Sequence, residues 1–85
     1  MELATQFEKA TASSKTLAQK PDNETLLKLY SLYKQSTDGD VSGEAPSNPF
    51  DFVAKAKYNA WEEQKGKSKE AAMQEYIDLV TKLKG

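Results

Sequence analysis

Apolar residues recur at intervals of three and four positions along four stretches of this chain, the spacing of helices that bury one face. The expected helices run from Leu3 to about Ala18, from Asp22 or Asn23 to about Ser36, from Phe52 to Lys65 and from Ser68 to about Leu83. No stretch alternates strictly between apolar and polar residues, as a half-buried strand would. The pattern therefore predicts an all-α fold.

The segments between these stretches are typical of helix ends and turns. Lys20-Pro21 is expected to end the first helix, because a residue before proline is pushed out of the helical region. Residues suited to cap helix N-termini precede the later helices: Asp22 or Asn23, Asp51 and Ser68. Gly66 fits the position that follows the third helix. The segment 39–51 is long for a connection in so small a domain, so it either crosses between distant helices or lines a site.

The second helix has a wider apolar face than a single packing contact needs. Leu26, Tyr30, Tyr33 and Thr37 share the centre of that face, and Lys34 is the i+4 neighbour of Tyr30. In one interpretation the tyrosines are core residues and the lysine reaches past them to water. In the other, one flank of the helix binds a ligand that has an anionic head group and an apolar tail.

The remaining helices carry residues with the same two interpretations. Lys57 lies one turn before Trp61, either covering the edge of a buried indole or facing a ligand. Lys15 lies at the edge of the first apolar stripe, where a lysine is most often solvated. Tyr76 is in the first half of the fourth helix, where a phenol is most often part of the core but can also reach a cleft. Spacing alone leaves these alternatives open.

Composition narrows the function to binding. The chain has 85 residues, enough for one small domain, and its net charge of −1 argues against general attraction to nucleic acid or to anionic membranes. All twelve basic residues are lysines, so an anion site must be a local group of ammonium ions. Cysteine and histidine are absent, which removes thiolate catalysis, the usual general base and the commonest metal ligands. We therefore expect no enzyme activity, no metal and no cofactor.

Neither a membrane span nor a secretory signal is expected. No apolar run approaches the roughly 18 residues that cross a bilayer, so stable membrane insertion is not expected. The N-terminal residues lack the basic region and apolar run of a signal peptide. A cytoplasmic location follows as the default expectation.

One long motif resembles a known family. The segment Tyr30–Asp40 reads Y-S-L-Y-K-Q-S-T-D-G-D and resembles the Y-x-x-Y-K-Q-x-T-x-G-D signature of the acyl-CoA-binding protein family. The resemblance continues through Phe7, Lys20-Pro21, Lys55–Trp61, Lys65–Ser68 and Ala72–Ile77. It thus covers nearly the whole chain as a single acyl-CoA-binding domain, residues 1–85. It implies an up-down four-helix bundle with a long crossover loop between helices 2 and 3.

The resemblance also implies a function and a set of contacts. The chain is expected to bind medium- to long-chain acyl-CoA esters as a monomeric carrier and pool former, and to deliver them to acyl-CoA-using enzymes. The family positions imply head-group contacts from Lys15, Tyr30, Tyr33, Lys34, Lys57 and Tyr76, and acyl-chain contacts from Leu26 and Leu27. The alternative is a protein-interaction module without a lipid ligand, which would bind a partner helix along the flank formed by Leu27 and Tyr30.

The chain departs from the family pattern at several positions. The segment 45–51 is one residue longer than the usual crossover, and Ala45 replaces a frequent basic residue. Tyr58 stands where the family commonly has tryptophan, and this change keeps an aromatic ring. Asp38 stands at a variable position within the signature. It adds negative charge close to the implied phosphate-binding region, so it is expected to weaken binding slightly.

Overall fold

The computed structural model describes residues 2–17, 19–42 and 50–84, and these residues form four helices and no strand. The bounds are Leu3–Ser14 for α1, Asn23–Thr37 for α2, Phe52–Glu63 for α3 and Lys69–Lys84 for α4. The predicted all-α, four-helix fold is confirmed. Most of the predicted crossover loop, residues 43–49, lies outside the described residues.

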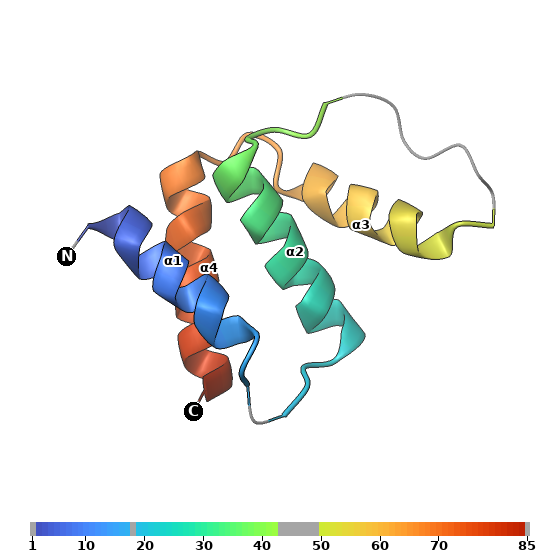
Figure 1. Ribbon diagram of the computed structural model, residues 1–85. Helices are drawn as coiled ribbons and strands as arrows, with labels where there is room; N and C mark the ends of the chain where they lie inside the picture. Colours follow the sequence, from blue (N-terminus) through green and yellow to red (C-terminus); the bar gives the residue numbers. More distant parts are fainter. Residues whose placement is uncertain (1, 18, 43–49, 85) are drawn as a thin grey trace.

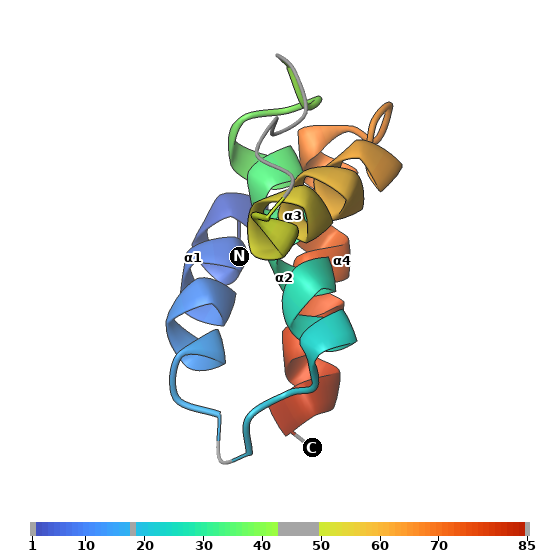
Figure 2. The same cartoon turned by 90° about the vertical axis from the view of Figure 1, so that its right-hand side faces the viewer.

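Helix α2 is the centre of the arrangement. It packs against α4 on one side and α3 on the other, while α1 packs against α4. Helices α1 and α4 run in the same direction and α2 runs in the opposite direction (Figure 1). Helix α3 crosses the far side of α2 at a steep angle and extends away from the other helices, as Figure 2 also shows. The bundle is therefore strongly skewed, with α3 attached to the rest through α2.

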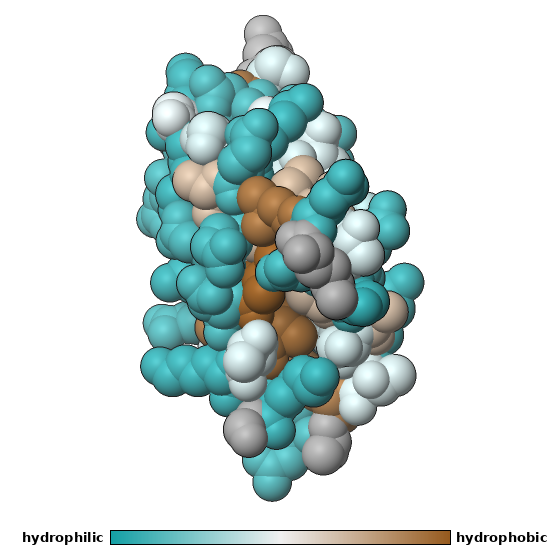
Figure 3. Space-filling model, turned by 90° about the vertical axis from the view of Figure 1, so that its left-hand side faces the viewer, coloured by the Kyte–Doolittle hydropathy of each residue, from teal (hydrophilic) through white to brown (hydrophobic). Residues whose placement is uncertain are grey.

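The core is built by the apolar stripes of α1, α2 and α4. Its buried hydrophobic residues are Phe7, Ala10, Leu29, Leu32, Ala72, Tyr76 and Val80. Helix α3 contributes no fully buried residue. On the face formed by α1 and α4, apolar side chains appear as a narrow band between hydrophilic ones (Figure 3). The helical spacing of the sequence thus predicted the core residues of α1, α2 and α4, while α3 is held mainly by contacts at its surface.

The predicted N-caps are confirmed where the structure describes them. The Asp22 carboxylate accepts a hydrogen bond from the Thr25 amide at 2.8 Å, and Asp51 accepts one from the Ala54 amide at 3.0 Å. The hydroxyl of Ser68 accepts one from the amide of Ala71 at 3.1 Å. Hydrogen bonding from the side chain of Thr25, together with the bond from its amide, lowers the pKa of Asp22 from its usual value. Each cap satisfies an amide that has no partner inside its helix.

The first helix ends earlier than predicted. Helix α1 stops at Ser14, so the prediction that it continues to about Ala18 was wrong, and Ala18 itself lies outside the described residues. The amides of Lys15 and Thr16 bond to carbonyl groups three residues back, which tightens the last turn. The hydroxyl of Ser14 donates to the Thr11 carbonyl and competes with the helical pattern. Local hydroxyl groups, rather than the later proline, accompany the end of the helix.

The third helix is also shorter than predicted. It ends at Glu63 and not at Lys65, and Gln64 occupies its C-cap. Gly66 therefore lies one position beyond the predicted one, with φ of 93°, a value that favours glycine. The amides of Gln64 and Lys65 both bond to carbonyl groups three residues back, so the helix closes with tighter turns.

A set of hydrogen bonds joins the end of α2 to the turn between α3 and α4. The Asp40 carboxylate accepts bonds from the Gly66 amide at 2.8 Å and from the Gln35 side-chain amide at 2.7 Å. Gln35 also donates to the Lys67 carbonyl at 2.7 Å. The bonds that Asp40 accepts from the Gly66 amide and the Gln35 side chain lower the pKa of Asp40. The indole of Trp61 donates to the carbonyl of Gly39, which has φ of 84°. These bonds hold the C-terminal end of α3 against the end of α2.

Candidate ligand-binding site

Two lysines face aromatic rings where α2 meets α3. The Lys57 ammonium lies 5.2 Å from the centre of the Tyr30 ring, so a cation of α3 rests over a phenol of α2. The Lys34 ammonium lies 5.0 Å from the centre of the Trp61 indole, so here the cation comes from α2 and the ring from α3. Both distances are within the range of cation–π attraction. Three of the predicted site residues are thereby brought together from two helices: Tyr30, Lys34 and Lys57.

The Lys34 ammonium has a second partner on its own helix. It forms an ion pair with the Asp38 carboxylate at 2.5 Å, with the two side chains 28% and 50% exposed. The hydrogen bond to Asp38 is the main reason that the pKa of Lys34 is raised, and the nearby Tyr30 and Tyr33 phenols add to the increase. Lys34 is therefore a positive charge that remains accessible to solvent.

The other two predicted phenols belong to an aromatic cluster with Phe7. The Tyr33 ring stacks on Phe7 at 5.9 Å between centres, and the Tyr76 ring meets Phe7 edge-on at 5.1 Å. Tyr33 is 43% exposed, so its outer face is open to a ligand. Tyr76 is only 4% exposed, and its hydroxyl donates to the Ser14 hydroxyl at 3.0 Å. In this structure Tyr76 is a core residue whose polar end reaches the rim.

Lys15 is exposed at the C-cap of α1, directly after the Ser14 that accepts the Tyr76 bond. It therefore lies next to the aromatic cluster in sequence, and its part in the site stays a prediction.

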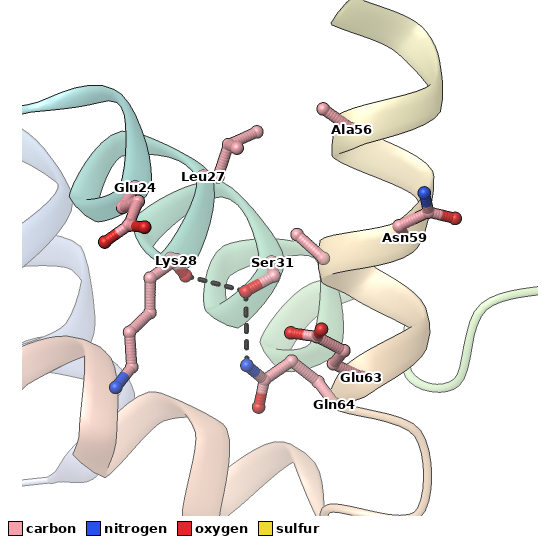
Figure 4. A pocket seen from close by; sticks show the side chains of 9 residues that line it. Glu24, Leu27, Lys28, Ser31, Ala56, Asn59, Glu63 and Gln64 are labelled. Carbon is pink, nitrogen blue, oxygen red and sulfur yellow. Dashed lines mark hydrogen bonds between the residues drawn. The ribbon is translucent and has the colours of Figure 1, made fainter. Parts of the chain in front are cut away.

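The predicted acyl-chain residues Leu26 and Leu27 are both half-buried. Leu27 lines a cavity of about 600 Å³ between α2 and α3, with Ala56 of α3 across from it (Figure 4). Ala60 is also in the lining. Ser31 lies inside this cavity, accepting a hydrogen bond from the Gln64 side chain and donating one to the Lys28 carbonyl. The polar side chains around it are Glu24, Lys28, Asn59, Glu63 and Gln64. Leu27 is the one predicted site residue in this lining.

The sequence reasoning did not find Ala56 and Ala60 as candidates. Their signal was their spacing, because two small residues at i and i+4 on a helix leave room beside a neighbouring helix. A second cavity of about 540 Å³ was also not predicted. It lies beside Tyr33 among α1, α2 and α4, and its apolar lining includes Phe7 and Met73.

Two features bear on metal binding and membrane spanning in the part of the chain that the structure describes: carboxylate clusters and long apolar helices. Within the described ranges, no three carboxylate side chains gather in a way that would hold a metal ion. Across the same ranges, no helix combines the length and the apolar character needed to cross a bilayer. The chemistry present is that of ammonium groups and phenols beside apolar surface, which suits an anionic amphiphile.

The fold and these side chains define a small all-α binding domain, and comparisons with known proteins identify its family. The sequence model of the family described as acyl-CoA-binding protein matches residues 4–80. The chain is 47% identical over 77 residues to acyl-CoA-binding protein homolog 1 of Caenorhabditis elegans, covering 91% of this chain and 88% of that one. This chain belongs to the acyl-CoA-binding protein family.

A solved structure and a larger protein extend the comparison. The fold matches the crystal structure of Oryza sativa acyl-CoA-binding protein 2 with a TM-score of 0.90 and 41% identity, covering 96% of this chain and 90% of that one. The chain is also 48% identical over 77 residues to rat enoyl-CoA delta isomerase 2, covering 91% of this chain but only 19% of that protein. The likeness to the isomerase is therefore confined to a small part of it.

Proposed function

We propose that this chain binds medium- to long-chain acyl-CoA esters and carries them as a monomer in the cytoplasm, without catalysing a reaction. The domain responsible spans residues 1–85. Acceptors for the bound ester would be acyl-CoA-using enzymes. Membership of the acyl-CoA-binding protein family supports the ligand class.

One observation in the structure carries the proposal most directly. Lys34 and Lys57 come from different helices, yet both ammonium groups lie where α2 meets α3, beside the Tyr30 and Trp61 rings. Two cations, each against an aromatic ring of the facing helix, favour a ligand with several phosphate charges. We assign the phosphate groups to Lys34, Lys57 and the Tyr30 hydroxyl. Tyr33 and Tyr76 remain candidates for the adenine side of the head group, and Lys15 remains a candidate for a further charge on it.

The acyl chain needs apolar surface close to these charges. Leu26 and Leu27 are half-buried on the helix that carries Tyr30 and Lys34, and the cavity beyond Leu27 has Ala56 and Ala60 in its wall. We propose that the chain follows Leu26 and Leu27 toward this cavity. Each methylene that leaves water there would contribute up to about 0.8 kcal/mol to binding.

Titration calorimetry with three ligands tests the proposal. We expect palmitoyl-CoA to bind much more tightly than either free CoA or free palmitate, because only the ester uses the lysines and the apolar surface together. A receptor for the head group alone would bind free CoA as well as the ester. If none of the three ligands binds, the assignment as a carrier is wrong. Incubation of palmitoyl-CoA with the protein, followed by mass spectrometry, should show the ester intact.

Removal of either central lysine should weaken binding of the ester. We expect Lys34→Ala and Lys57→Ala each to cost about 1–3 kcal/mol, the usual cost of a lost charge-assisted hydrogen bond, or roughly 5- to 150-fold in Kd. Lys82→Ala is the matched control, because it removes the same charge from an exposed position near the end of α4. Unchanged affinity in the Lys34 and Lys57 variants would remove these residues from the site.

A further inference from the structure

The Asp38 carboxylate is paired with Lys34, the ammonium group that the proposed site would use to bind a phosphate. It pairs with the Lys34 ammonium at 2.5 Å, on the same helix and one turn further on. The ammonium is at the same time over the Trp61 ring, at 5.0 Å from its centre. Without a ligand, Lys34 is therefore held by a carboxylate and an indole. A phosphate that binds this ammonium competes with the carboxylate for its charge and its N–H donors.

Helix stability does not explain an aspartate at this position. Asp38 is the C-cap of α2, where the partial negative charge of the helix end disfavours another anion. The pair also has its lysine before its acid, which is the weaker order for i, i+4 partners. The amide of Asp38 bonds to the Lys34 carbonyl at 2.8 Å, a contact that any residue with a backbone amide would make. The carboxylate adds little to the fold beyond its pairing with Lys34.

We propose that Asp38 is an internal competitor that sets the affinity of the site by occupying Lys34 when no ligand is bound. This inference rests on the proposed function, since it assumes that Lys34 meets an anionic group of the ligand. The apparent affinity equals the intrinsic affinity multiplied by the fraction of molecules in which Lys34 is free of Asp38. A partly exposed ion pair is worth roughly 0.2–1 kcal/mol, which corresponds to a reduction of about two- to sixfold.

The competing carboxylate acts only on ligands that use Lys34. Binding through other residues leaves the Lys34–Asp38 pair intact and escapes the penalty.

The test compares Asp38→Asn with Asp78→Asn by titration with palmitoyl-CoA. Asn keeps the size of the side chain and removes its charge. Asp78 is an exposed carboxylate on α4, so its variant makes the same change in net charge away from Lys34. We expect Asp38→Asn to bind the ester about two- to sixfold more tightly and Asp78→Asn to bind it within about 1.5-fold of the unmodified protein. An equal gain in both variants would overturn the proposal, because net charge alone would explain it.

A second comparison asks whether the effect passes through Lys34. In a Lys34→Gln background, Asp38→Asn should change the Kd by less than about 1.5-fold, because the ammonium it competes for is absent. A gain as large as in the unmodified protein would overturn the competition, as would a lack of any gain from Asp38→Asn alone. These failures differ from failure of the proposed function, in which the unmodified protein does not bind palmitoyl-CoA at all.

Discussion

Lengthening the acyl chain of the CoA ester from eight to sixteen carbons is expected to tighten binding by up to about 6 kcal/mol. The eight added methylenes would each contribute at most about 0.8 kcal/mol, before the cost of ordering a flexible chain is subtracted. Leu27, Ala56 and Ala60 provide the apolar wall against which they leave water. Calorimetry on esters of increasing length measures the change in Kd. For the tightest esters, the Kd is measured by letting them displace a weaker ester that is already bound.

A variant of the cavity wall provides the control for this series. Ala56→Leu places a larger side chain opposite Leu27, so the gain per methylene should stop at a shorter chain while binding of the eight-carbon ester stays nearly unchanged. Affinity that does not depend on chain length would contradict the placement of the tail. Equal loss for short and long esters in the variant would instead indicate general damage to the fold.

The second large effect concerns stability. Replacing Leu32 by alanine is expected to lower the free energy of unfolding by about 2–5 kcal/mol. Leu32 is fully buried, with 0% exposure, on the helix that packs against both α3 and α4. The substitution removes apolar contacts and leaves a cavity that the surrounding helices can fill only in part. For a domain of this size, such a loss is a large share of a total of roughly 5–15 kcal/mol.

Urea unfolding followed by circular dichroism measures this change. Val53→Ala is the comparison, because Val53 is 65% exposed on α3 and its truncation should cost less than about 0.5 kcal/mol. A loss below 1 kcal/mol for Leu32→Ala would show that the packing around α2 is looser than the structure indicates. Similar losses in both variants would contradict the assignment of the core to α1, α2 and α4.

Most of the fold was accessible from the sequence because local spacing determines it. Within each helix the core residues are three or four positions apart, as in the pairs Phe7/Ala10, Leu29/Leu32 and Tyr76/Val80. The capping residues before α2, α3 and α4 act within one turn. The C-terminal ends of α1 and α3 were placed too late. Those ends depend on amides and hydroxyls that choose between carbonyl groups three and four residues back, and such choices differ little in energy.

The site was less accessible, because spacing relates residues of one helix only. It placed Tyr30 beside Lys34, but nothing in it brought Lys57 over the Tyr30 ring. The resemblance to a family implied only that Lys57 shares a site with Tyr30 and Lys34, and the ligand roles of all eight residues remain predictions. The role of Asp38 was anticipated as a nearby charge, whereas its direct pairing with Lys34 required coordinates. The space beside Ala56 and Ala60 depends on the distance between two helices, which no local pattern reports.

The peripheral attachment of α3 separates the protein into parts of unequal local stability. Helix α3 has no buried residue and, among the described helices, packs on α2 and no other, while the bonds of Asp40 and Trp61 secure one of its ends. Partial detachment of its other end leaves the packing of α1, α2 and α4 in place. In the proposed function, such a detachment would let a hydrocarbon tail enter sideways between α2 and α3 while the rest of the domain stays folded.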